Sequence, residues 1–351
     1  MARRSIGSRR RPRDRMQNRI YIAAALIIVI VMIAVIYGLG PFGKDEGNTP
    51  IVSNDVNVPE VNVPAVNDID VPVVRRAAQE EPNTRVVRVA PNVDVEANPE
   101  AADLIAEAMT LIDASPSRII EARERLNETL AMPMSKEQRS VVEIQLSKLA
   151  DKWLFSRKIF PQDQLCGTYK VKQGDLLSII GKQFKVPYEI LMEINHIRHP
   201  KALREGDTIK VINGPFHAKV YRSAFTMDLY LQNTFIRRFP VGLGKPGMET
   251  PTGLWLVKPG GKLVKPVWTD PIGGKTYHPE DPDYPLGSRW IALEGKEGAA
   301  KDRTGFAIHG TKEPEQIGTA GSQGCIRLHN GDAIFVYNLL APGHSFVRVE
   351  D

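Results

Sequence analysis

A run of twenty residues without a charged side chain, at positions 20–39, constrains this chain more than any other feature of its sequence. As a helix, the run would measure about 30 Å, the thickness of the hydrocarbon core of a bilayer. Tyr21 and Tyr37 stand near its two ends, where amphipathic rings favour the membrane interface. Cleaved signal sequences have a shorter apolar stretch and a small-residue cleavage site, which is missing after residue 39. The run therefore predicts a single transmembrane helix.

Positive charge is concentrated just before this run. Eight of the 46 lysines and arginines lie within residues 1–19, together with one acid, Asp14. The rest of the chain carries 38 basic and 40 acidic residues, so the net charge of +5 does not indicate a surface for nucleic acid. Because positive loops stay inside, residues 1–19 are predicted to be a cytoplasmic tail, and the chain after about residue 40 lies outside the cell membrane. The lipid bilayer is the partner expected for residues 20–39.

Two segments of different character follow. Residues 40–97 are rich in Pro, Val and Asn, and their prolines favour an extended linker over helix. From residue 98 to residue 157 apolar side chains recur at helical spacing, and Asn98, Ser115 and Ser135 precede three predicted helices. The helices resemble tetratricopeptide hairpins, although no complete repeat signature is present. We predict a small α-helical module at 98–157 and assign no chemistry to it.

Residues 168–212 carry strand, helix, helix and strand signals in that order, with Gly-Asp turns at 174–175 and 206–207. The segment resembles a LysM domain, a βααβ module. This resemblance implies binding to glycans that contain N-acetylglucosamine, such as peptidoglycan or chitin. Gly174, Asp175 and Asn195 are the candidate sugar contacts. A packed module without a ligand is the alternative.

The last segment, 216–350, is predicted to form a mainly-β domain. Short alternating stretches replace the helical period, and turns rich in Gly, Pro and Asn separate them. No helix is expected in this segment, and residues 259–283 are expected to form one long loop. The predicted strands are 218–222, 228–232, 235–241, 254–257, 290–293 and 306–308.

A histidine and a cysteine near the end of the chain are the candidate catalytic pair. His309 begins the sequence His-Gly-Thr, and Cys325 stands in Ser-Gln-Gly-Cys-Ile-Arg. A thiol becomes a usable nucleophile near neutral pH when a base or a cation lowers its pKa, and a histidine in reach can take its proton. Gly324 permits a sharp turn that exposes N–H groups to an oxyanion, and Arg327 adds a positive charge that favours the thiolate. Most Cys and His pairs are structural, but a thiol in a polar turn is not a typical core residue.

These motifs resemble the L,D-transpeptidase catalytic domain of the YkuD type. In that family Ile-His-Gly-Thr is followed, about fifteen residues later, by Ser-x-Gly-Cys-Ile-Arg. Gln323 stands where some members have a second histidine. Three further segments occur in the family's order: Gly242-x-Gly244-Lys245, Thr250-Pro251-Thr252-Gly253 and Tyr284-Pro285-Leu286-Gly287.

The resemblance implies a role for each residue of the motif. Cys325 would be the nucleophile, and His309 would accept and return the proton. The carbonyl of Gly310 would orient the imidazole, and the N–H groups of Gly324 and Cys325 would bind the oxyanion. Arg327 would either order the active-site turn or bind a substrate carboxylate.

The resemblance also implies a two-step acyl transfer in the bacterial periplasm or cell wall, without a metal or an organic cofactor. Cys325 would form a thioester with a peptidoglycan tetrapeptide stem and release D-alanine. An amine would then resolve the thioester, which gives a 3→3 cross-link or attaches a protein or a D-amino acid. Water as the acceptor would give an L,D-carboxypeptidase, and a degenerate site would leave a non-catalytic wall tether. A sortase-like enzyme fits poorly, because its arginine lies on a separate strand.

Overall fold

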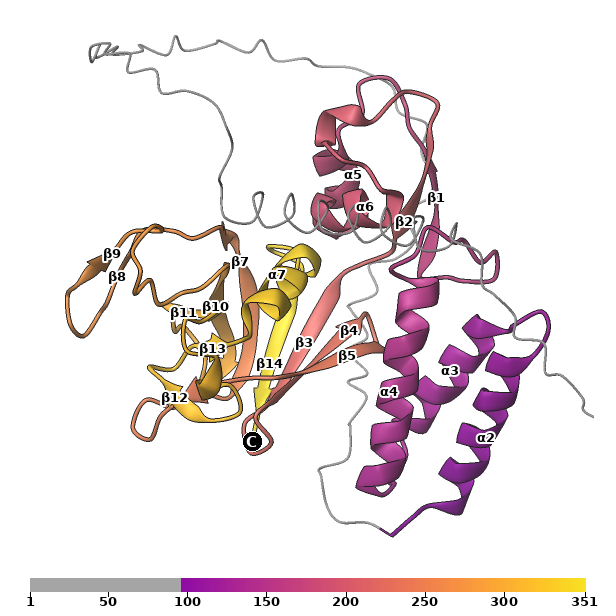
Figure 1. Cartoon of the computed structure of the whole chain (residues 1–351), viewed down its shortest axis with the longest axis horizontal. Helices are drawn as coiled ribbons and strands as arrows, with labels where there is room; N and C mark the ends of the chain where they lie inside the picture. The colour runs from indigo at the N-terminus through magenta and orange to yellow at the C-terminus, as the bar shows by residue number, and fades with distance from the viewer. Residues whose placement is uncertain (1–95) are drawn as a thin grey trace, which may run out of the picture. The chain divides into compact units, whose positions relative to one another are not determined.

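The computed structural model describes residues 96–351, which contain three consecutive modules (Figure 1). The predicted tail at 1–19, the predicted membrane helix at 20–39 and nearly all of the predicted linker at 40–97 lie outside the described residues. Within residues 96–351, no helix is long and apolar enough to cross a bilayer.

The first module is a set of three helices, and local capping explains where two of them begin. The Asn98 side chain accepts hydrogen bonds from the N–H groups of Glu100 and Ala101, and Ser135 forms a capping box with Gln138, both as the sequence predicts. The second helix begins later than the expected Ser115, because residues 114–118 turn back on the end of the first helix. The helices are α2 (Pro99–Asp113), α3 (Ile119–Thr129) and α4 (Lys136–Trp153).

The second module has the predicted order of strand, helix, helix and strand. Its two strands pair antiparallel, from Cys166 opposite Ile212 to Lys170 opposite Thr208. Its elements are β1 (Cys166–Lys170), α5 (Leu177–Gln183), α6 (Tyr188–Asn195), the short 3₁₀ helix η1 (Pro200–Ala202) and β2 (Thr208–Ile212). Cys166 is a buried free thiol at the start of β1.

The third module is built on an eight-stranded mixed sheet with the strand order β13-β11-β10-β7-β14-β3-β4-β5 (Figure 1). The pairs β11–β13 and β14–β3 are parallel, and the other neighbours are antiparallel. The strands are β3 (Phe216–Tyr221), β4 (Thr226–Leu231), β5 (Thr234–Pro240), β7 (Gly253–Leu263), β10 (Trp290–Gly298), β11 (Phe306–His309), β13 (Ile326–Arg327) and β14 (Phe346–Glu350). Small sheets pair β6 (Leu243–Gly244) with β12 (Ala320–Ser322), and β8 (Trp268–Thr269) with β9 (Thr276–Tyr277); η2 (Pro314–Gln316) is a 3₁₀ helix.

Two expectations for this module are wrong. A helix, α7 (Asn330–Leu339), is present where none was expected. Its Ala-Ile-Phe-Val-Tyr run is too short and too rich in β-branched and aromatic residues for periodicity to separate a helix from a strand. The expected long loop at 259–283 instead contains the end of β7 and the β8–β9 hairpin, in which Trp268 stacks against Tyr277.

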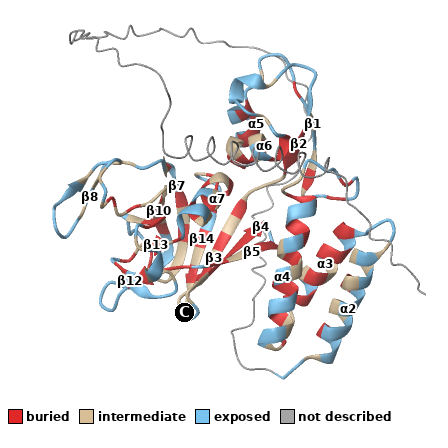
Figure 2. Ribbon diagram, in the orientation of Figure 1, coloured by how far each residue is buried: buried red, intermediate tan, exposed pale blue. Residues whose placement is uncertain are grey.

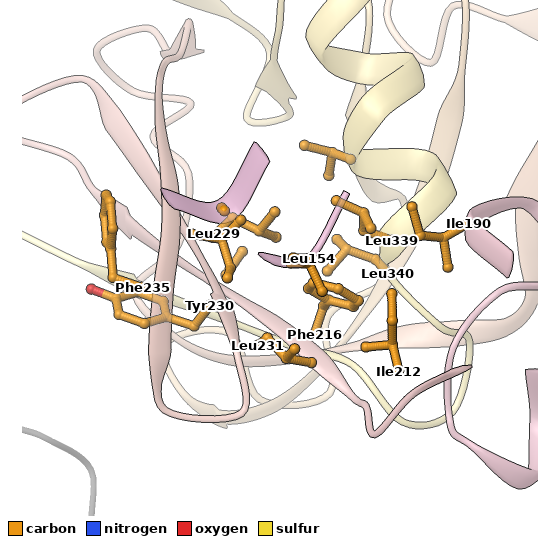
Figure 3. Close-up of a cluster of buried hydrophobic side chains, with 14 of the residues drawn as sticks. Leu154, Ile190, Ile212, Phe216, Leu229, Tyr230, Leu231, Phe235, Leu339 and Leu340 are labelled. Carbon is orange, nitrogen blue, oxygen red and sulfur yellow. The ribbon is translucent and has the colours of Figure 1, made fainter. Parts of the chain in front are cut away.

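The hydrophobic core runs through all three modules. Leu154 follows α4, Ile190 belongs to α6, Phe216 begins β3 and Leu339 ends α7, and all are at most 1% exposed within one apolar cluster (Figure 3). Buried residues likewise occur in every module (Figure 2). The ammonium group of Lys210, in β2, is buried and donates to the carbonyls that end α4, at Trp153, Ser156 and Lys158. The first two modules therefore depend on each other for buried polar partners.

The helical module also covers the edge strand β5. Arg238 on this strand donates to both carboxylate oxygens of Asp228 in β4, at 2.6 and 2.7 Å, and to Glu143 in α4 at 2.7 Å. Arg237 reaches Asp151, also in α4, at 2.8 Å. An uncovered edge strand presents unpaired backbone groups to other chains. The contact with α4 therefore protects one end of the sheet.

Candidate active site

The parallel pairing of β11 with β13 brings the predicted catalytic residues together. Ile308 lies opposite Ile326 and His309 lies opposite Arg327, so Cys325, one residue before β13, is level with Ala307. The backbone of Ala307 is close enough to the Cys325 side chain to lower the pKa of the thiol. Because residues two apart on a strand share a face, His309 and Cys325 lie on the same face of the sheet.

The turn that carries Cys325 is fixed by the buried Ser322. Its hydroxyl donates to the Cys325 carbonyl at 2.7 Å and accepts the Gly324 N–H at 3.1 Å. Gly324 has φ +108°, and a Cβ there would lie 2.8 Å from the Phe306 ring, so only glycine fits. The Gly324 N–H, expected in the oxyanion hole, is therefore already bound to a hydroxyl and must leave it before it can bind an oxyanion.

The imidazole of His309 is held by its neighbours in a defined tautomer. Its Nδ1 lies 2.6 Å from the carbonyl oxygen of Gly310. Since a carbonyl only accepts, Nδ1 carries the proton in the neutral ring and Nε2 keeps its lone pair. Trp290, opposite His309 in β10, stacks on the ring with centroids 5.6 Å apart and planes 21° apart. Nothing local in the sequence reveals this contact, because Trp290 lies on another strand.

Burial sets the protonation states of this pair. It raises the pKa of the Cys325 thiol to about 11, although the Ala307 backbone and the charge of Arg327 act in the other direction. Burial lowers the pKa of His309 to about 4, and the positive charge of Arg327 lowers it further. The backbone groups of Gly310 and Leu286 act in the opposite direction. Arg327 favours the thiolate, as expected, but the loss of hydration outweighs it. At neutral pH the site holds a neutral thiol beside a neutral imidazole, and this imidazole can act as a base.

Two upstream segments of the sequence converge on the same turn. Gly242 exchanges backbone hydrogen bonds with Arg327, and the Lys245 N–H donates to the Ser322 carbonyl. The Thr250 hydroxyl donates to the Gly324 carbonyl at 2.9 Å and accepts the Gly244 N–H at 3.1 Å. These contacts explain why separate Gly- and Thr-containing motifs accompany the His and Cys motifs.

The side chain of Arg327 points to another part of the same site. It donates to the Gln316 amide oxygen and lies 3.4 Å from a carboxylate oxygen of Glu313. Only 16% of its side chain is exposed. The side chain of Arg327 is therefore committed to the 313–316 segment and not to the turn that carries Cys325.

A hollow of about 540 Å³ opens beside the catalytic turn. Gln323 of that turn lines it together with Phe306, Met248, Ile272, Arg303 and Glu249. Within residues 96–351, the Arg303 side chain has no ion-pair or hydrogen-bond partner. The hollow therefore offers both apolar surface and an uncommitted positive charge. No cluster of three or more His, Cys, Asp or Glu side chains in the described part of the chain could hold a metal ion.

The candidate sugar contacts in the second module behave differently from one another. Gly174 adopts φ +81° in the turn, and the Asp175 carboxylate accepts from the Tyr169 hydroxyl and the Lys172 N–H. Asn195 is 7% exposed, and its amide bonds to backbone groups of α6 and β2. The Asn195 amide therefore holds the module together and does not face a sugar, whereas the Gly174–Asp175 turn is accessible.

Comparison with known proteins assigns two of the three modules to families. Residues 215–349 match the L,D-transpeptidase catalytic domain, and residues 169–211 match the LysM domain. The YkuD protein of Bacillus subtilis, named as an L,D-transpeptidase, is 31% identical over 183 residues, which cover 50% of this chain and 94% of that protein. The chain belongs to the L,D-transpeptidase family. It is an enzyme of this class that also carries a peptidoglycan-binding LysM domain.

More distant relatives carry the same family name. The ErfK/SrfK protein of Escherichia coli is 27% identical over 177 residues, which cover 46% of this chain and 47% of that protein. Among solved structures, L,D-transpeptidase 3 of Mycobacterium tuberculosis is similar with a TM-score of 0.32 and 16% identity, over 42% of this chain and 66% of that one. The matched region covers about half of the Escherichia coli protein and just under two thirds of the Mycobacterium tuberculosis protein.

Proposed function

We propose that this protein is an L,D-transpeptidase of the bacterial cell envelope with Cys325 as its nucleophile. The observation that carries the proposal is the β11–β13 pairing, which sets Cys325 and His309 on one face while the Gly310 carbonyl holds Nδ1 of the imidazole. The substrate is a peptidoglycan tetrapeptide stem. The bond that breaks joins its third residue to the terminal D-alanine.

In the first step Sγ of Cys325 attacks the carbonyl of the third stem residue while Nε2 of His309 takes the thiol proton. The negative charge on the carbonyl oxygen is stabilised by the Cys325 N–H, and by the Gly324 N–H once it leaves Ser322. The imidazolium then returns its proton to the departing amine, so D-alanine leaves and a thioester remains. In the second step an acceptor amine attacks the thioester and gives a proton to Nε2 of His309. The imidazolium passes this proton to the departing thiolate as the new amide forms.

The hollow beside Gln323 is the proposed site for the acyl donor. Its position next to the Cys325 turn suits a peptide whose carbonyl must reach Sγ. Arg303 provides an unpaired cation, and stem peptides carry carboxylates that a guanidinium can bind. Met248 and Ile272 offer apolar surface to the aliphatic parts of the peptide.

The membrane and glycan contacts complete the proposal. The uncharged run at 20–39, preceded by eight arginines, anchors the chain in the cytoplasmic membrane with its N-terminus inside. A linker with the length of residues 40–97 would span roughly 40 Å, enough for the enzyme to work within the wall. The Gly174–Asp175 turn of the LysM domain holds glycan strands. Alkaline extraction of membranes tests the anchor, because the full chain should stay in the pellet and residues 96–351 should not.

The activity is tested with the described fragment, residues 96–351, and a disaccharide tetrapeptide. Formation of 3→3 dimers, seen by mass spectrometry, is the expected result. Release of D-alanine without dimers would mark an L,D-carboxypeptidase, and no reaction would mark a wall tether. Cys325→Ala must abolish whichever reaction occurs. The LysM domain is best tested for binding within this fragment too, because Lys210 and its apolar neighbours are buried against the other modules.

A further inference from the structure

The amide of Asn330, at the start of α7, joins two segments that flank the catalytic histidine. Its Oδ1 accepts hydrogen bonds from the backbone N–H groups of Ser288 at 2.9 Å and Thr311 at 3.3 Å. Its Nδ2 donates to the Thr311 carbonyl at 2.8 Å, and the Ser288 hydroxyl donates to the Asn330 carbonyl at 2.8 Å. Asn330 is exposed, but both polar atoms of its side-chain amide have hydrogen-bond partners within the protein.

One peptide group connects this amide to His309. The Gly310 carbonyl, which holds Nδ1 of His309 at 2.6 Å, and the Thr311 N–H, which donates to Asn330, are the two ends of the same peptide group. A peptide group is planar and rigid, so holding its N–H fixes the direction of its carbonyl. The second bond, from Nδ2 to the Thr311 carbonyl, fixes the next peptide group as well.

Two glycines make room for the amide. A Cβ at Gly310 would lie 2.2 Å from Oδ1 of Asn330, and one at Gly287 would lie 2.1 Å from it. Gly287 also has φ +62°, a conformation that other residues rarely adopt. Gly310 directly follows His309, and Gly287 lies in the segment before β10. The site is therefore shaped around Asn330 from two sides.

We propose that Asn330 is a positioning residue for the acyl transfer. It orients the Gly310 carbonyl, and this carbonyl sets the tautomer and the direction of the His309 ring. The inference rests on the proposed function for its rate measurements, but its structural consequence at His309 can be measured without any substrate.

The kinetic test compares Asn330→Ala with Gly331→Ala in the fragment 96–351. Gly331 is the next residue of α7, and a Cβ there meets nothing within 4 Å, so its substitution is the matched control. We expect kcat for acylation by the disaccharide tetrapeptide to fall roughly tenfold to a hundredfold in Asn330→Ala, with KM almost unchanged. The control should keep the kcat of the parent fragment. Asn330→Asp keeps an oxygen for both N–H groups and should recover part of the rate.

The structural test follows the Nδ1 proton of His309 by NMR with ¹⁵N-labelled histidine. The parent fragment and Gly331→Ala should show a hydrogen-bonded Nδ1–H resonance, which should broaden or disappear in Asn330→Ala. A protein that melts at a lower temperature but keeps this resonance and the control's kcat would overturn the proposal. If Asn330→Ala does not fold, Asn330→Leu decides, because it keeps a similar volume without the acceptor oxygen, and an unchanged resonance and kcat would again overturn the proposal. Failure of the parent fragment to form an acyl-enzyme would refute the proposed function and leave this NMR test intact.

Discussion

Cys325 is expected to rest as a neutral thiol, and the pH dependence of its alkylation measures this directly. Burial raises its pKa to about 11 from an ordinary value of 9.0. That shift corresponds to about 2.7 kcal/mol in favour of the thiol. At pH 7, four units below this pKa, only about one molecule in ten thousand carries the thiolate. Because iodoacetamide reacts with the thiolate, the alkylation rate should follow this fraction.

The rate of carbamidomethylation at Cys325, measured by peptide mass spectrometry, should rise about tenfold per pH unit from pH 7 to pH 10. Cys166 serves as an internal reference, since it is 5% exposed and burial raises its pKa to about 12. His309→Ala should leave the slope unchanged, because burial lowers the pKa of His309 to about 4 and the ring is neutral throughout. A rate that is flat between pH 6 and pH 9 would indicate a thiolate paired with an imidazolium, and it would refute the reasoning from desolvation.

Three further predictions concern the surroundings of the site and the packing of the modules. Trp290→Leu removes the ring that stacks on His309, a contact worth about 1 kcal/mol. It should lower kcat roughly fivefold with little change in KM. An unchanged kcat would mean that the stacked ring only packs the core. Burial raises the pKa of Glu143 to about 7, despite the opposing charges of Arg238 and Arg139. Because the folded state holds this proton more tightly than the unfolded chain, the free energy of unfolding should fall by about 3 kcal/mol as the pH rises from 4.5 to 7. Urea denaturation should show this slope flattened in Glu143→Gln. Lys210→Met leaves three carbonyls without their donor and should cost about 2 kcal/mol, seen as a lower melting temperature; a melting temperature equal to that of the parent would contradict the capping role.

Features that depend only on residues close together in the sequence could be predicted from it. The capping side chains of Asn98 and Ser135 lie within three residues of the N–H groups that they accept from. The LysM order of elements follows from turns and periodicity over a short segment. Cys325 and His309 were identified by spacing and motif. The structure places them at neighbouring strands, with Cys325 level with Ala307, two residues before His309.

Features that depend on register or burial could not be predicted. Trp290 meets His309 only because β10 and β11 pair at those positions. Nothing in the sequence indicates that the ammonium group of Lys210 donates to carbonyls at the end of a helix in another module. The neutral state of Cys325 was missed for a related reason, since a nearby arginine is visible in the sequence but the loss of hydration is not. Long-range packing decides each of these cases.

The most direct test of the proposed chemistry is the mass of the enzyme trapped during turnover. The fragment 96–351 is mixed with disaccharide tetrapeptide, quenched in acid within the first turnover and digested, and the peptide that contains Cys325 is weighed. We predict that this peptide gains the mass of the donor less D-alanine, that hydroxylamine removes the added mass, and that His309→Ala slows its appearance. An unmodified Cys325 while dimers or free D-alanine accumulate would contradict the account, because the reaction would then proceed without the thioester.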